Sequence, residues 1–310
     1  MNRRPLTALL AVSLLAVPLA GCASGLGTPS DDASASGGAT LEVVASTNVY
    51  GDIAEQIGGD RVSVTSIIDS PDKDPHEYEA DARTQLALSK AQLVIENGGG
   101  YDDFVDTMLS AADNKIAPVL NAADISGYEQ EPAEGEFNEH MWYDFPTVQK
   151  LSDELVNQLT AIDPEGAETY EKNAETFDSQ LAALEQQEKD IKASFDQTGV
   201  AITEPVPLYM LEAAGLVNKT PDAFSEAIEE GTDVPADVLK QTQELFSSGQ
   251  VKALVYNEQT SGAQTELVLK AAKDAGVPVV PVTETLPDGT DYISWMTTNL
   301  NALQGALSGK

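Results

Sequence analysis

The chain has 310 residues, a formal net charge of −34 and one cysteine. Because a phosphate backbone is bound by a basic surface, this charge argues against nucleic acid as a partner. One cysteine cannot form an internal disulfide, and zinc sites built on four cysteines, or on two cysteines and two histidines, are excluded.

The N-terminus predicts export and attachment to a membrane. Two arginines precede an apolar run at residues 6–19, which is too short for a stable membrane span. The tetrapeptide LAGC at residues 19–22 resembles a bacterial lipobox, in which the signal is cut before the cysteine and the cysteine is lipidated. We therefore expect residues 1–21 to be a lipoprotein signal peptide and Cys22 to anchor the mature protein to the outside of the cell membrane. The alternative is an ordinary signal peptide followed by an incidental cysteine.

Small and polar residues dominate residues 22–40, and this composition predicts a flexible tether. About 270 residues then remain, which is enough for two α/β domains rather than one. We expect an N-terminal α/β lobe at residues 41–162, a linking helix at 163–198 and a C-terminal α/β lobe at 199–310.

Strand and helix patterns alternate through the expected N-terminal lobe. The strands are rich in β-branched residues, and the segments between them have the period of helices. The expected strands are residues 41–47, 62–68, 93–98 and 117–120. The expected helices are residues 48–57, 83–90, 103–112 and 148–162. This alternation predicts a mainly parallel sheet with helices on both faces.

One long amphipathic helix is expected to link the two lobes. Asp163 and Pro164 supply an N-cap and a first-turn proline, and apolar residues then recur at three- and four-residue steps as far as Phe195, with Glu188 interrupting the stripe. A helix of this length would measure roughly 50 Å and could run along both lobes. The competing interpretation is a coiled coil with a partner helix.

The alternation of strands and helices returns after the long helix, which predicts a second α/β lobe. The expected strands are residues 199–203, 251–256 and 277–282. The expected helices are residues 206–214 and 265–275. Residues 218–237 are acidic, and we expect them to form a loop over the surface near the edge between the lobes.

The chain has two histidines, His76 and His140, and each lies in a short motif with acidic residues. Imidazole binds zinc, iron and related metals, and carboxylates suit harder ions such as manganese, so the pair suggests a mixed nitrogen and oxygen metal site. Ligands of open parallel sheets bind beyond the carboxyl ends of the strands. His76, Glu204 and Glu284 each follow an expected strand, and His140 lies on a loop that enters a helix.

Several neighbouring residues have alternative roles. Asp144 is either an acceptor for an imidazole N–H, outside the metal ligands themselves, or the N-cap of the following helix. Asp288 and Asp291 are acids that could replace Glu284. The aromatic residues of these segments are expected to pack rather than to contact a ligand. They are Tyr78, Trp142 and Trp295.

Five segments resemble, in order, the zinc/manganese (cluster A-I) solute-binding proteins of ABC importers. They are residues 74–79 (DPHEYE), 86–98 (LALSKAQLVIENG), 140–144 (HMWYD), 203–205 (TEP) and 283–287 (TETLP). The resemblance implies two lobes, each a mainly parallel sheet with flanking helices, joined by one long helix, with a metal in the cleft between them. It maps the metal ligands onto His76 and His140 from the first lobe and Glu204 and Glu284 from the second.

By this resemblance the chain is a lipid-anchored receptor rather than an enzyme. It would capture one divalent ion, Mn²⁺ or Zn²⁺ with Fe²⁺ as a further option, and deliver it as a monomer to an ABC permease driven by a cytoplasmic ATPase. Ligands without sulfur favour manganese by hardness, although zinc binds most such sites more tightly. Two alternatives remain: an exported metal-dependent enzyme, and a surface adhesin or interaction lipoprotein that uses metal for stability.

The chain departs from the family pattern at three points. Glu139 stands where the family often has proline, and Glu284 where it often has aspartate, which leaves mono- or bidentate binding open. The histidine-rich loop of some zinc receptors is missing from the sequence.

Overall fold

The computed structural model describes residues 40–70, 78, 81–133 and 135–309. These belong to one compact unit of the chain, residues 38–310. The expected signal peptide, the expected lipidation site Cys22, nearly all of the expected tether and His76 lie outside the described residues. Within the described part of the chain, no helix is both long and apolar enough to cross a membrane.

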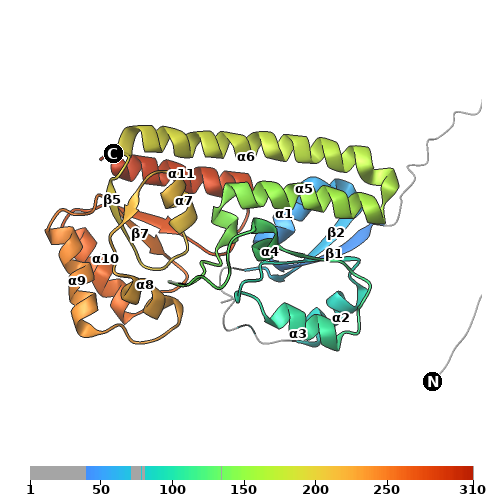
Figure 1. Cartoon of the computed structure of the whole chain (residues 1–310), viewed down its shortest axis with the longest axis horizontal. Helices are drawn as coiled ribbons and strands as arrows, with labels where there is room; N and C mark the ends of the chain where they lie inside the picture. The colour runs from blue at the N-terminus through green and yellow to red at the C-terminus, as the bar shows by residue number, and fades with distance from the viewer. Residues whose placement is uncertain (1–39, 71–77, 79–80, 134, 310) are drawn as a thin grey trace, which may run out of the picture. The chain divides into compact units, whose positions relative to one another are not determined.

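The first lobe is built on a four-stranded sheet whose neighbouring strands are all parallel, in the order β2-β1-β3-β4. Its strands are β1 (Leu41–Thr47), β2 (Val62–Ile68), β3 (Leu93–Glu96) and β4 (Val119–Asn121). Its helices are α1 (Asn48–Gly58), α2 (Ala82–Lys90), α3 (Phe104–Ala111), α4 (Ala122–Ser126) and α5 (Phe145–Ile162). Val43 packs in a cluster with α1 and α5, whereas its neighbour Val44 packs with α2 and α3. Helices therefore cover both faces of the sheet, as the sequence predicts (Figure 1).

The second lobe repeats this plan with a parallel sheet in the order β6-β5-β7-β8. Its strands are β5 (Gly199–Ile202), β6 (Val217–Asn218), β7 (Leu254–Asn257) and β8 (Val279–Val282). Its helices are α7 (Leu208–Ala213), α8 (Asp222–Glu229), α9 (Ala236–Ser247), α10 (Ala263–Asp274) and α11 (Tyr292–Leu307). Ala201 packs with α8, α9 and α10, and the adjacent Ile202 packs in the cluster that contains α7 and α11. The expected second α/β lobe is thus present.

The linking helix α6 (Ala167–Phe195) has 29 residues and runs along both lobes (Figure 1). At 1.5 Å per residue its length is about 44 Å. Its buried stripe belongs to one apolar cluster that also holds residues of both sheets, so the chain itself covers the stripe and no coiled-coil partner is needed. The stripe includes Glu188, which is only 4% exposed and occupies a buried position instead of breaking the pattern.

The linking helix starts where the sequence predicts, but its first turn is a 3-10 turn. A short 3-10 turn, Pro164–Gly166, precedes α6, and Gly166 occupies the N-cap position without a side-chain cap. Asp163 instead accepts hydrogen bonds from Arg61 Nε at 2.7 Å and from the Tyr170 hydroxyl at 2.8 Å. Asp163 is thus the N-cap residue of the 3-10 turn, with Pro164 in the first position, and its carboxylate also holds side chains from α6 and from the segment before β2.

Residues 218–237 are not the loop that the sequence suggests, because they contain α8 and the first residues of α9. Phe224 and Ile228 lie four residues apart on α8 and are both buried in the apolar cluster of the second lobe. Their spacing is that of one helix face. The helix places Glu229 at its last residue.

Candidate metal-binding site

The order of the second sheet brings three polar side chains together at one edge. Strand β7 lies between β5 and β8, and all three strands are parallel. Glu204 follows β5 by two residues, Asn257 ends β7, and Glu284 follows β8 by two residues. All three side chains are buried. The two predicted acids therefore lie beyond the carboxyl ends of their strands, and the structure adds a residue between them that the sequence interpretation missed.

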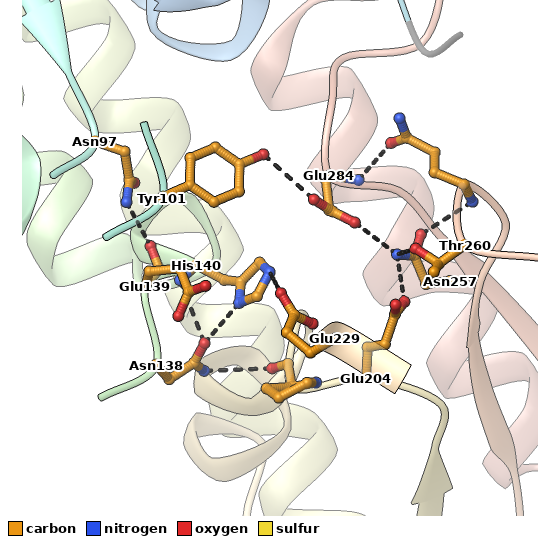
Figure 2. Close-up of polar contacts among 12 residues, drawn as sticks. Asn97, Tyr101, Asn138, Glu139, His140, Glu204, Glu229, Asn257, Thr260 and Glu284 are labelled. Atoms are coloured by element: carbon orange, nitrogen blue, oxygen red, sulfur yellow. Dashed lines mark hydrogen bonds and ion pairs between the residues drawn. The ribbon is translucent and has the colours of Figure 1, made fainter. Parts of the chain in front are cut away.

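The Asn257 amide bridges the two carboxylates (Figure 2). Its Nδ2 group lies 2.5 Å from Glu204 Oε2 and 2.7 Å from Glu284 Oε1. The amide is oriented by its other end, because Asn257 Oδ1 accepts a hydrogen bond from the backbone N–H of Gln259 at 3.1 Å. A neutral donor therefore lies between two acidic groups, where a cation would interact more strongly.

The raised pKa of Glu204 is consistent with a site that binds a cation. Burial raises the pKa of Glu204 to about 9, and the negative charges of Glu229 and Glu284 add to the rise, while hydrogen bonds from Asn257 and Thr260 oppose it. Buried acids that lie close together cannot all ionise without a compensating positive charge. A divalent ion would supply that charge.

Glu284 is held by groups from both lobes. The backbone N–H groups of Glu284 and Thr285 both donate to Gln259 Oε1, at 2.7 and 2.9 Å, and this fixes the loop after β8. From the first lobe, the hydroxyl of Tyr101 donates to Glu284 Oε2 at 3.3 Å. Of the two acids proposed as substitutes, Asp291 caps α11 by accepting from Ser294 N at 2.7 Å.

His140 contributes a buried imidazole from the first lobe. Its Nδ1 atom lies 2.7 Å from Asn138 Oδ1, and Asn138 Nδ2 in turn donates to the backbone oxygen of Pro205. The Asn138 amide is therefore oriented with its oxygen toward the ring, which assigns the ring proton to Nδ1 and leaves the lone pair on Nε2. Among the described residues His140 Nε2 has no hydrogen-bond partner, as suits a nitrogen that would bind a metal.

Asp144 is not the group that orients His140. It is the N-cap of α5, where its Oδ2 atom accepts from Thr147 N at 3.2 Å, and it also accepts from the Tyr128 hydroxyl at 3.2 Å. Of the two roles considered for Asp144, the structure shows the cap. The acceptor for the imidazole N–H is Asn138, two residues before the histidine.

Aromatic rings pack around His140. The centre of the Trp142 ring lies 5.2 Å from the centre of the imidazole, and the centre of the Tyr101 ring lies 6.0 Å from it. Both pairs are in edge-to-face contact. Trp142 is fully buried, as the packing role predicts. The other two aromatic residues also pack. The ring centres of Tyr78 and Phe104 are 4.5 Å apart, and those of Trp295 and Tyr143 are 5.7 Å apart.

The sequence interpretation also missed Glu229. Its Oε1 atom lies 3.4 Å from His140 Nε2, so the last residue of α8 meets the histidine of the opposite lobe (Figure 2). The signals that could have revealed it are Pro221 before the helix, the Phe224 and Ile228 pair, and Gly231 after it.

The structure describes three of the four predicted ligands. His140 lies opposite Glu229, and Glu204 and Glu284 share the Asn257 amide, whereas His76 lies outside the described residues. Within the described ranges, no three histidine, cysteine, aspartate or glutamate side chains are grouped closely enough to hold an ion. The described donors are two buried acids and one imidazole, a set that suits a divalent transition metal.

Known proteins resemble the chain along nearly all of its folded part. The family described as "Zinc-uptake complex component A periplasmic" (ZnuA) matches residues 43–306. The manganese-binding lipoprotein MntA of Halalkalibacterium halodurans is 30% identical over 211 residues, 66% of this chain and 66% of that protein. The manganese ABC transporter substrate-binding lipoprotein scaA of Streptococcus gordonii is 26% identical over 316 residues, 96% of this chain and 98% of that protein.

The fold is also found among solved structures. The periplasmic zinc binding protein TroA of Treponema pallidum superposes with a TM-score of 0.70 at 19% identity, covering 87% of this chain and 99% of that one. The architecture of this chain, two parallel sheets joined along one long helix, is thus one that solved structures share. Because the family match extends over residues 43–306, the chain belongs to the family of periplasmic zinc-uptake components A.

Proposed function

We propose that the chain is the metal-binding receptor of an ABC importer, which captures one divalent transition metal ion and delivers it to the permease. The observation that carries the proposal is the Asn257 amide held between Glu204 and Glu284, because it marks a position where two buried acids converge on one hydrogen-bond donor. His140 faces the same region from the first lobe (Figure 2).

The proposed ligands are His76, His140, Glu204 and Glu284. Neutral imidazoles and ionised carboxylates would share one ion, and two carboxylates would cancel the charge of a divalent metal. The named relatives bind manganese or zinc, and one is an iron transporter lipoprotein of Streptococcus pyogenes. With two nitrogen and two oxygen donors and no sulfur, we favour Mn²⁺ over Zn²⁺ as the ion carried.

The remaining features of the proposal concern the surroundings of this site. Residues 1–21 would be removed as a signal peptide, and Cys22 would carry the lipid that holds the protein outside the cell membrane. Residues 22–40 would form the tether, 41–162 and 199–310 the lobes, and 163–198 the link between them. The receptor would act as a monomer on its permease and ATPase, without catalysis.

Metal counting tests the proposal. Residues 23–310 are stripped of metal, reloaded with Mn²⁺, Zn²⁺ and Fe²⁺ in competition, and assayed for bound metal per chain. Alanine substitutions of His76, His140, Glu204 and Glu284 are expected to abolish or strongly weaken binding of a single ion. Unchanged stoichiometry and affinity in all four variants would contradict the proposal.

The metal-free protein provides a second test, against a role in which metal only stabilises the fold. The apolar cluster that contains α6 extends into both lobes and consists of hydrophobic side chains. We therefore expect the stripped chain to keep its circular dichroism spectrum and a cooperative unfolding transition. Loss of the folded state on stripping would instead support a structural metal.

A further inference from the structure

We propose that Glu229 is an additional metal ligand, which binds the captured ion together with His140 and favours Mn²⁺ over Zn²⁺. The inference rests on the proposed function, because it assigns a residue to the same site. Glu229 is not among the ligands that the sequence motifs predict. It comes from α8, a helix outside all of those motifs.

The distance between the two side chains is that of two ligands on one metal. Glu229 Oε1 and His140 Nε2 are 3.4 Å apart. Two donor atoms that each lie about 2.1 Å from a tetrahedral metal are themselves about 3.4 Å apart. The pair therefore lies at a separation that two ligands of a shared ion can have.

The chemistry of the contact also calls for a cation. The hydrogen bond from Nδ1 to Asn138 leaves Nε2 as a lone-pair donor, and a carboxylate oxygen is a lone-pair donor as well. Both groups are shielded from solvent: His140 is fully buried, and both carboxylate oxygens of Glu229 are buried although its side chain is 14% exposed. A metal ion placed between them would be bound by both.

The position of α8 supports this role. Its apolar residues Phe224 and Ile228 are buried in the core of the second lobe, so the end of the helix is fixed on the scaffold that carries Glu204. Figure 2 shows Glu229 between His140 and Glu204. Glu229 is also the strongest charged influence on Glu204, which agrees with carboxylates that share one site.

Glu229 also lines a cavity. A cavity of about 370 Å³ is lined by Glu229, by Asn138 and Phe137 from the first lobe, and by Pro205 and Leu208 from the second. Three further acids on or beside α8 line it, namely Asp222, Glu226 and Glu230. The negative charge of these acids would raise the concentration of cations beside Glu229.

A further carboxylate ligand changes the relative affinity of the site for Mn²⁺ and Zn²⁺. Four ligands suit tetrahedral zinc, whereas a fifth protein ligand with oxygen as donor suits ions that accept higher coordination numbers and hard donors, such as Mn²⁺. Removal of Glu229 should therefore weaken Mn²⁺ binding more than Zn²⁺ binding.

The test compares Glu229→Gln and Glu229→Asp with a matched control, Glu230→Gln. Glu230 is the next residue, is exposed and lines the same cavity, so its substitution removes the same charge in nearly the same place. Dissociation constants for Mn²⁺ and Zn²⁺ are measured by competition with a chelator. Glutamine keeps the shape of the side chain, and aspartate keeps the charge but withdraws the carboxylate by one methylene.

We expect both Glu229 variants to bind Mn²⁺ about tenfold or more weakly, with a smaller loss for Zn²⁺, and Glu230→Gln to stay within about twofold of the wild type. Wild-type affinity in Glu229→Asp would show that only the charge matters and would overturn the proposal. Tighter binding by Glu229→Gln would overturn it too, since Glu229 would then compete with the metal for His140.

Failure of this inference can be told apart from failure of the proposed function. If the wild-type chain binds no metal, the proposed function is wrong. If it binds one ion and Glu229→Gln binds that ion with unchanged affinity, only the role of Glu229 is wrong. The visible spectrum of the Co²⁺-loaded protein gives a second readout, because a lost ligand should change its intensity in Glu229→Gln but not in Glu230→Gln.

Discussion

Tyr101 of the first lobe donates a hydrogen bond to Glu284 Oε2 of the second lobe at 3.3 Å. A second tyrosine of the first lobe, Tyr143, donates to the backbone oxygen of Thr283 at 2.9 Å, one residue before Glu284. The loop that carries a proposed ligand is therefore held by the opposite lobe through protein contacts alone. Release of a bound ion by separation of the lobes would have to break these hydrogen bonds.

Substitution of Tyr101 by phenylalanine is expected to speed metal release. Loss of one hydrogen bond to a carboxylate, about 1.5–3 kcal/mol, corresponds to a dissociation rate about ten- to 150-fold higher. Stopped-flow transfer of metal to a chelator measures this rate. Tyr256→Phe, which removes a hydroxyl 3.5 Å from Glu266 on α10, is the control and should leave the rate unchanged. An unchanged rate in Tyr101→Phe would show that this contact does not retain the metal.

Substitution of Asn257 by alanine is expected to destabilise the empty protein by about 1–3 kcal/mol, because two buried acids lose a shared donor. A bound metal would replace that donor, so the gain in stability on metal binding should be larger in the variant than in the wild type. Denaturant unfolding with and without metal measures both quantities. Exposed Asn301→Ala is the control, with a change of less than about 0.5 kcal/mol.

If Asn257→Ala lost the same stability with and without metal, the amide would be a structural group in both states. It would then not occupy the place of the ion.

Metal affinity should rise with pH through the range in which Glu204 titrates. Burial and the charges of Glu229 and Glu284 raise the pKa of Glu204 to about 9, so the empty site holds a proton there at neutral pH. Metal binding must displace that proton, and each displaced proton makes the affinity rise about tenfold per pH unit below the pKa. Calorimetry in buffers of different ionisation enthalpy should detect proton release. A flat affinity between about pH 7 and pH 9 would contradict the protonated state of Glu204.

Glu188 should make the fold less stable as the pH rises. Burial raises its pKa from 4.5 to about 9, with a contribution from the charge of Glu185. A folded state with the raised pKa binds the proton more tightly than the unfolded chain, so stability is complete below the unfolded pKa and falls as the pH rises toward the folded value. Each pH unit in this window removes about 1.4 kcal/mol.

We therefore expect Glu188→Gln, which mimics the protonated acid, to match the wild type near about pH 4.5 and to exceed it by about 2–4 kcal/mol near pH 8. Exposed Glu175→Gln on the same helix is the control and should stay within about 0.5 kcal/mol at both pH values. Equal stability of Glu188→Gln and wild type near pH 8 would show that Glu188 ionises without penalty in the folded chain.

Much of the fold could be predicted because the local signals agree with the final packing. Strand β1 and helix α1 are predicted almost to the residue, since a β-branched run meets Asn48 and a helical pattern that ends in glycines. Glu204 and Glu284 could be placed because parallel strands direct their carboxyl ends to one edge. The interruption expected at Glu188 was wrong because an acid can be buried in a helix stripe when its pKa rises.

The remainder depends on contacts between segments that are distant in sequence. Asn257 follows a strand as plainly as Glu204 does, but only the order β5-β7-β8 shows that it lies between two acids. The sequence suggested Asp144 as the partner of His140, and only the directions of the side chains show that Asn138 is the partner. Glu229 lies in an acidic segment, where α8 is only eight residues long and its helical period therefore covers little more than two turns.

The most direct test of the account is a crystal structure of the metal-loaded protein with anomalous scattering recorded at the manganese edge. We expect one peak between the lobes, within ligand distance of His140 Nε2 and of carboxylate oxygens from Glu204 and Glu284, with His76 and Glu229 completing the shell. A manganese peak elsewhere in the molecule would contradict the account. So would crystals grown with excess Mn²⁺ in which no peak lies between the lobes and Glu204 and Glu284 keep their hydrogen bonds with Asn257.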